Sequence, residues 1–101
     1  MIVVRNVFRL KFGATRKARE LWREGAGFLT RAGMREVRIL TDLVGPFYTF
    51  VVESSHDSLA EWESSAEREM GSAEWRAWYQ RFTPLVESGY REVLTVADVA
   101  G

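Results

Sequence analysis

The sequence predicts an α+β domain whose strands and helices follow the order β-α-β-β-α-β. Two observations support this order: apolar residues alternate with period two in four segments, and they recur every three or four residues in the two segments between. A third observation concerns the size of the domain. A chain of 101 residues with 47% apolar side chains suits one core, so residues 1–101 are expected to form a single domain. Strands in this order form a four-stranded antiparallel sheet with both helices on one face, the ferredoxin-like arrangement.

The first predicted strand is the stretch IVVRNVFRLKF, residues 2–12, which alternates strictly. One face is apolar except for an amide, and it holds Ile2, Val4, Asn6, Phe8, Leu10 and Phe12. The other face is mixed, and it holds Val3, Arg5, Val7, Arg9 and Lys11. This alternation is typical of a strand with one side against a core.

A helix is predicted after Gly13, with Thr15 as its N-cap and Gly33 as a left-handed C-cap. Its apolar stripe consists of Ala18, Leu21, Trp22, Gly25, Phe28, Leu29 and Ala32, and charged residues take the opposite side. The stretch REVRILTDL, residues 35–43, is the second predicted strand. Gly45 and Pro46 then form a turn. The third strand is FYTFVVES, residues 47–54, which is apolar on both sides except for Thr49, Glu53 and Ser54.

The second helix is predicted to be split. Ser58 and Glu61 have capping-box spacing at its start, and Gly71 with Ser72 ends its first part and caps the next. In that second part a stripe recurs at helical spacing: Trp75, Trp78, Tyr79, Phe82, Leu85 and Val86. Pro84 is expected to kink or tighten its last turn. Gly89 is expected to end it, and YREVLTVADV, residues 90–99, is the last strand.

Two helices can cover only one face of this sheet, yet both faces carry apolar residues. The third strand offers Phe47, Thr49 and Val51 on one side and Tyr48, Phe50 and Val52 on the other. Val3 and Val7 add to the uncovered face, together with either Leu94 and Val96 or Val93 and Ala97. Because exposed apolar patches mark interfaces, we expect a twofold homodimer in which two sheets pack face to face.

The uncovered face also carries charged residues. Arg5 and Arg9 could pair with Glu53 or Glu92 at the interface. The alternative is that long arginine stems shield the sheet while their charged groups stay in water.

The composition excludes several classes of function. Fourteen basic and fourteen acidic residues give no net charge, which predicts neither nucleic-acid nor membrane binding. The chain has no cysteine, so thiol chemistry and disulfides are absent. No stretch approaches the roughly 20 apolar residues of a membrane span, and the N-terminal stretch does not look like a signal peptide. The expected compartment is therefore the cytoplasm.

Three stretches carry a resemblance to a known family: VVRNVFRLKFG, LTDLVGPFYTFVVESSHDSLAEWE and EWRAWYQRFTPLVESGYREVL. With these the chain resembles the dimeric α+β barrel superfamily, and within it most closely the NIPSNAP-like small bacterial proteins. The resemblance implies a ferredoxin-like protomer, a sheet-to-sheet dimer and often a cavity between sheet and helices. It implies no single activity, since relatives include cofactor-free oxygenases, isomerases, cyclases, haem enzymes and proteins without an assigned function.

His56, Asn6 and Tyr79 are the candidate catalytic residues. His56 is the only histidine, and it could act as a base oriented by Asp57 or Glu61. The alternative is a half-exposed loop histidine. Its surroundings lack the spacing of a metal site, no serine is marked as a nucleophile, and no cofactor is expected. In haem-binding relatives a histidine from this half of the fold is the axial ligand, but His56 does not align to that role.

Asn6 interrupts an apolar face, and a buried amide must find hydrogen bonds or lose about 1–3 kcal/mol. It could face a polar ligand or an ordered water in a cavity, or it could pair with the backbone, Tyr48 or Tyr79. In the cofactor-free oxygenases that the chain resembles, Asn, Trp and Tyr groups around the pocket hold the substrate, although no motif fixes them to positions here.

The aromatic stripe of the last helix has two interpretations. Such a stripe is usually core, but four large rings are hard to close-pack and could leave an aromatic-lined pocket. The candidate pocket residues are Asn6, Tyr48, Trp62, Trp75, Trp78 and Tyr79. The predicted function is a homodimer that binds a small hydrophobic or aromatic molecule between helices and sheet. The alternatives are a cofactor-independent monooxygenase or isomerase acting on an aromatic or polyketide-like substrate, and an interaction module with a filled core.

Overall fold

The structure is a computed structural model that describes residues 1–99. Its elements are β1 (Ile2–Leu10), α1 (Thr15–Arg31), β2 (Arg35–Thr41), β3 (Thr49–His56), α2 (Leu59–Met70), α3 (Ala73–Phe82), the 3-10 turn η1 (Thr83–Leu85) and β4 (Val86–Thr95). The predicted order of strands and helices, with the second helix split, is confirmed.

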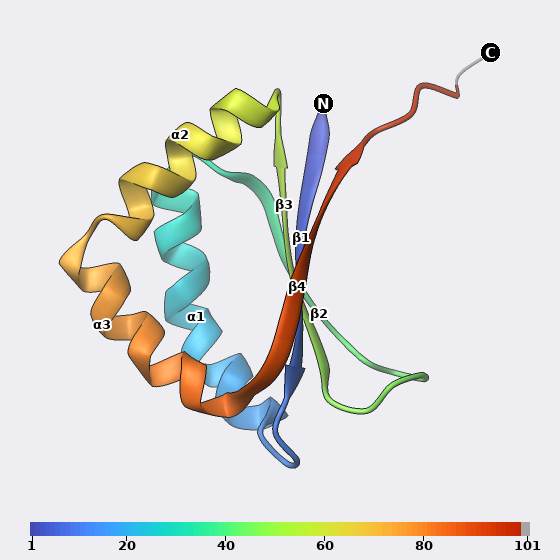
Figure 1. Cartoon of the computed structure of the whole chain (residues 1–101), viewed down its shortest axis with the longest axis vertical. Helices are drawn as coiled ribbons and strands as arrows, with labels where there is room; N and C mark the ends of the chain where they lie inside the picture. Colours follow the sequence, from blue (N-terminus) through green and yellow to red (C-terminus); the bar gives the residue numbers. More distant parts are fainter. Residues whose placement is uncertain (100–101) are drawn as a thin grey trace.

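The four strands form one antiparallel sheet in the order β2-β3-β1-β4. All three α-helices lie on one face of this sheet, and the other face carries no helix (Figure 1). We call these the helix face and the open face. This is the predicted ferredoxin-like arrangement.

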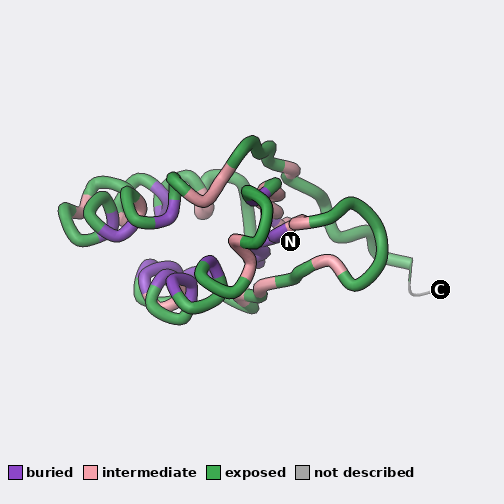
Figure 2. The backbone as a smooth tube through the Cα atoms, turned by 90° about the horizontal axis from the view of Figure 1, so that it is seen from below, coloured by how far each residue is buried: buried purple, intermediate pink, exposed green. Residues whose placement is uncertain are grey.

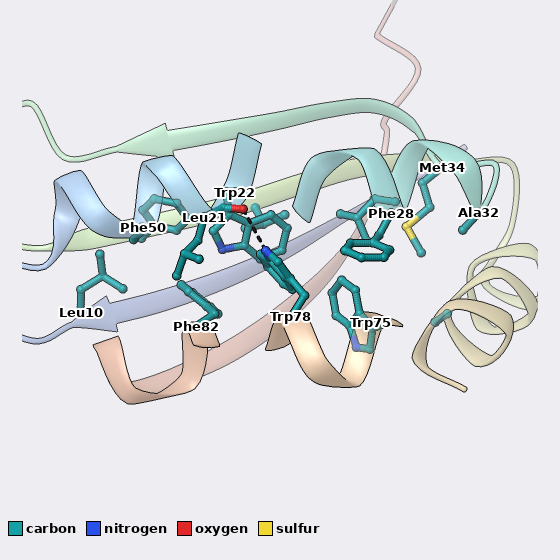
Figure 3. Packing of buried hydrophobic residues seen from close by; sticks show 14 residues of the cluster. Leu10, Leu21, Trp22, Phe28, Ala32, Met34, Phe50, Trp75, Trp78 and Phe82 are labelled. Carbon is teal, nitrogen blue, oxygen red and sulfur yellow. Dashed lines mark hydrogen bonds between the residues drawn. The ribbon is translucent and has the colours of Figure 1, made fainter. Parts of the chain in front are cut away.

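The core lies between the helices and the two central strands. Val4 and Leu10 of β1 and Phe50 and Val52 of β3 are almost completely buried on the helix face. Strand alternation explains this, because Asn6 pairs with Val52 and every second residue from there points the same way. The helices add large rings to this layer, as Figure 3 shows: Trp22, Phe28, Trp75, Trp78 and Phe82. Figure 2 shows burial concentrated where the helices and the central strands meet.

Two serine caps were predicted and both are confirmed. The Ser58 hydroxyl accepts a hydrogen bond from the Glu61 backbone N–H, and the Ser72 hydroxyl accepts one from that of Trp75. Gly33 has a φ of 91°, as expected for a left-handed residue after a helix. The prediction for Thr15 was wrong: it is the first helical residue, and the cap position is taken by Ala14, which makes no side-chain hydrogen bond.

The predicted end of the last helix was also wrong. The helix ends at Phe82, and Pro84 lies in the tight turn η1 that leads directly into β4. Gly89 is therefore in the middle of a strand, opposite Phe8. A Cβ there would lie 3.1 Å from the Phe8 ring, so a glycine at this position makes room for that ring rather than stopping a helix. The last strand covers 86–95 instead of 90–99.

The ends of the three other strands also differ from the prediction: β1 ends at residue 10 instead of 12, β2 at 41 instead of 43, and β3 covers 49–56 instead of 47–54. Phe12 lies beyond β1 and is 90% exposed, and Phe47 and Tyr48 precede β3. Tyr48 has a positive φ of 61°, so the chain turns at this residue and cannot continue the extended strand.

Candidate functional site

A pocket of about 540 Å³ lies between the helices and the β1–β4 half of the sheet. Its walls come from β1, α1, β3, α2, α3 and β4. The lining residues are Asn6, Phe8, Trp22, Leu29, Met34, Ser54, Trp62, Ala66, Glu69, Met70, Trp75, Tyr79, Val86, Ser88, Gly89, Tyr90 and Arg91. Most of these side chains are apolar or aromatic, and a few polar groups lie among them.

The aromatic stripe of α3 divides between core and pocket. Trp75 and Tyr79, one turn apart, stack with ring centroids 5.4 Å apart, and both line the pocket. Trp78 and Phe82 are almost completely buried in the core and do not line it.

The position of Trp78 depends on α1. Its indole Nε1 donates a 2.9 Å hydrogen bond to the Leu21 carbonyl, which Figure 3 shows as a dashed line. The same ring lies directly over Gly25, where a Cβ would come within 2.3 Å of it. Because Gly25 has no side chain, α3 can approach α1 closely here and keep Trp78 out of the pocket.

Trp22 joins the core to the pocket. Its ring meets that of Trp78 edge-on at 4.7 Å and also lines the pocket. Its Nε1 is buried and has no hydrogen-bond partner among residues 1–99.

Asn6, Trp62 and Arg91 form a polar corner of the pocket. Arg91 Nε donates a 2.6 Å hydrogen bond to Asn6 Oδ1, and the guanidinium carbon lies 4.9 Å from the centroid of the Trp62 ring. Asn6 is thus half-buried and paired with Arg91 from the neighbouring strand, and neither expected tyrosine bonds to it.

His56 lies next to the pocket without lining it. It is 0% exposed at the end of β3, which corrects the expectation of a half-exposed loop histidine. Its Nε2 is 2.8 Å from Ser54 Oγ, and Ser54 does line the pocket. Strand alternation explains the pair, since residues 54 and 56 share the helix face. The sequence analysis had not identified Ser54 as a neighbour of this histidine.

Burial favours the neutral form of His56. Loss of hydration disfavours the imidazolium and lowers the pKa of His56, although the nearby charge of Glu61 opposes this. Neither predicted orienter bonds to the ring: Asp57 pairs with Arg35, and Glu61 accepts from the Asp57 backbone. The Nδ1 of His56 has no hydrogen-bond partner within the described part of the chain.

Tyr48, a pocket candidate, and Glu69, an acid that was not predicted, both lie away from the polar corner. Tyr48 is not in the pocket; its ring packs against Phe12 with centroids 5.1 Å apart. Glu69 of α2 does line the pocket, and burial raises its pKa. Ser54, Glu69 and Arg91 were missed from the sequence. Only the alternation of β3, which places Ser54 beside Phe50 and Val52, was a usable signal.

The open face of the sheet has an acid at its centre. Glu53 is 5% exposed and receives hydrogen bonds from Arg38 and Arg5, the latter at 3.0 Å. These bonds, that from Arg38 above all, hold the pKa of Glu53 below its usual value. The expected Arg5–Glu53 pair is confirmed, whereas Arg9 stands opposite Thr49 and Ser88 instead.

Apolar residues surround this acid. The open face also carries Val3, Val7, Leu40, Val51, Tyr90 and Leu94. Of the two predicted sets from the last strand, the structure therefore places Leu94 here, and Val93 points to the helix face.

Two further classes of site were looked for in residues 1–99. They contain no group of three His, Asp or Glu residues placed to hold a metal ion. No helix in this range has the length and apolar character needed to cross a membrane.

The fold is shared with solved structures, although no family model and no curated protein sequence matches the chain. An uncharacterized NIPSNAP domain protein from Burkholderia xenovorans superposes with a TM-score of 0.90 at 21% identity, covering 100% of this chain and 99% of its own. A NIPSNAP family protein of unknown function from Agrobacterium tumefaciens gives 0.91 at 20% identity, covering 99% and 91%. SnoaB, a cofactor-independent oxygenase from Streptomyces nogalater, gives 0.74 at 13% identity, covering 97% and 94%.

These similarities confirm the predicted resemblance to NIPSNAP-like α+β barrel proteins at the level of the fold. The superposed proteins include one of unknown function and one oxygenase. A fold with such different members selects no single activity, so function must be argued from the site.

Proposed function

We propose that this protein binds a small hydrophobic or aromatic molecule in the pocket between its helices and its sheet. The observation that carries the proposal is an aromatic-walled pocket of about 540 Å³ with few polar groups. Pockets of this size and character are the usual form of small-molecule sites. Trp78 and Phe82, from the same helix as Trp75 and Tyr79, lie in the adjoining core and do not fill the pocket.

Tryptophan fluorescence tests this proposal, since Trp22, Trp62 and Trp75 all line the pocket. Titration with naphthol, corrected for its absorbance, should give a saturable change. Ala66→Leu narrows the pocket and should weaken binding at least tenfold. The matched control is Ala77→Leu on the exposed side of α3, which should bind like the wild type. A response that never saturates in the wild type contradicts the proposal.

The protein is proposed to work as a homodimer whose two open faces pack together. The apolar residues around Glu53 support this, and the acid there is already neutralised by two arginines. The loop between β2 and β3 and the C-terminal segment also project on the open side in Figures 1 and 2. That loop carries exposed Leu43, Val44 and Phe47, which a second copy could cover.

Sedimentation velocity at micromolar concentration tests the dimer. Leu94→Glu, on the open face and 40% exposed, should shift the protein to monomer. Leu59→Glu, on α2 and 48% exposed, should leave the dimer intact. A wild type that stays monomeric rejects this part of the proposal. We propose that the protein acts in the cytoplasm, since a chain without cysteines needs no oxidising compartment.

The second candidate function is a cofactor-independent monooxygenase or isomerase acting on an aromatic or polyketide-like substrate. The observation that favours it is the buried His56, whose Nε2 lies 2.8 Å from Oγ of the pocket residue Ser54, because both reactions need a base that removes a proton. With an anthrone as the test substrate, oxygen uptake would reveal oxygenation. A change in the ultraviolet spectrum of the anthrone would reveal isomerisation. Such turnover should drop in Asn6→Ala, His56→Ala and Tyr79→Phe. Full activity in all three variants, or none in the wild type, rejects this candidate.

A further inference from the structure

Arg91 is the only positively charged residue among the described residues that line the pocket. It stands on β4 at the polar corner with Asn6 and Trp62. No carboxylate of residues 1–99 forms an ion pair with it: the ion pairs in this range involve Arg5, Arg35, Arg38 and Arg81.

Two contacts fix the orientation of the Arg91 guanidinium. The Nε–H is committed to Asn6 Oδ1 at 2.6 Å, and the face of Trp62 supports the group at 4.9 Å. Asn6 is itself held in the central strand β1, so the acceptor is part of the rigid sheet. Both terminal amino groups remain available. A guanidinium held in this way presents a fork of donors that matches the two oxygens of a carboxylate.

We propose that the ligand of the pocket is a carboxylate with a planar apolar body, and that Arg91 binds its acidic group. This inference rests on the proposed small-molecule function and names the chemical class of the ligand. The aromatic walls, Trp75 and Tyr79 among them, would take the apolar body.

The acid in the pocket wall is compatible with an anionic ligand. Glu69 follows Trp62 by seven residues on α2, which places the two about 10 Å apart along the helix axis. The carboxylate of the ligand at Arg91 is therefore at the other end of the pocket from Glu69.

Calorimetry with two matched probes tests the inference. Naphthoate is a planar aromatic carboxylate, and naphthamide has the same shape without the charge. The wild type should bind naphthoate about tenfold or more tightly than naphthamide, the ratio expected for one charge-assisted contact. Arg91→Met keeps an apolar chain over Trp62 and should make the two affinities equal. Arg76→Met, on the exposed side of α3, is the control and should keep the wild-type ratio.

The remaining outcomes separate this inference from the proposed function. Arg91→Lys keeps the charge without the fork and should fall between the wild type and Arg91→Met. Unchanged naphthamide affinity in Arg91→Met shows that the pocket is intact. If the wild type binds both probes saturably and equally, the carboxylate inference is wrong and the binding function stands. If it binds neither, both fail.

Discussion

Replacing Gly25 by alanine tests whether the close contact between α1 and α3 holds Trp78 in the core. At an ordinary position inside a helix, this change stabilises a protein by about 1 kcal/mol. At Gly25 the new Cβ would lie 2.3 Å from Trp78 Cζ2 and 2.8 Å from Trp22 Cε3. Both distances are well inside van der Waals contact, so the rings must move.

The size of the effect follows from these contacts. Overpacking a core costs about 1–3 kcal/mol, and moving Trp78 weakens its bond to the Leu21 carbonyl, a loss of about 1 kcal/mol. After the helix gain is subtracted, Gly25→Ala should lower the free energy of unfolding by about 1–3 kcal/mol. Gly27→Ala is the matched control, because only the flexible Arg31 Nη1 lies near, at 3.3 Å. It should raise stability by about 0.5–1 kcal/mol.

Urea denaturation followed by circular dichroism gives both values. A Trp78→Phe background adds a second check, since phenylalanine lacks the ring atoms that clash with the new Cβ. There the cost of Gly25→Ala should shrink or vanish, which a double-mutant cycle measures. If Gly25→Ala proves as stable as Gly27→Ala, the account of how Trp78 is kept from the pocket is wrong.

Three further predictions concern charge and capping. His56 is buried with a lowered pKa, so its contribution to stability should be complete above about pH 6.5 and fall as the pH drops below that value. Urea midpoints measured across pH should show this slope. His56→Gln should reduce the slope. Glu53 also has a lowered pKa, so its contribution should be present above about pH 4.5 and lost in more acidic solution. Glu53→Gln removes the titrating carboxylate and should flatten that acid limb, whereas an unchanged limb would contradict the assignment to Glu53. Ser72→Ala removes the cap of α3 and should cost about 1 kcal/mol by thermal unfolding, whereas exposed Ser64→Ala should change little.

The elements were predictable because their signals are local. The alternation of residues 2–10 and the helical spacing from Ala18 to Leu29 each lie within one segment. Burial followed the helical pattern closely, whereas in β1 only Val4 and Leu10 of the apolar face are fully buried. Ser58 and Ser72 were found as caps for the same reason, since a cap bonds a backbone group three residues away. The end of the last helix was misjudged because Gly89 suits a helix terminus as well as a strand beneath a ring.

The site was predictable only in part. Asn6 was a candidate because it interrupts an apolar face, and Trp62, Trp75 and Tyr79 were candidates because they are large rings on the helix that covers the sheet. All four line the pocket. Arg91 was missed, since it looks like a solvated charge until the register of β1 and β4 sets it opposite Asn6. These two residues are separated by 85 positions, and no local pattern connects them.

The sequence by itself determined which segments become strands and helices and which side of each is apolar, because those properties depend on the spacing of residues near one another. Only the tertiary structure decided where the rings of α3 divide between core and pocket, which polar groups meet at the corner of Asn6, and that His56 lies behind Ser54. Those outcomes depend on strand register and on the distance between helix and sheet. The whole chain sets both quantities as it packs.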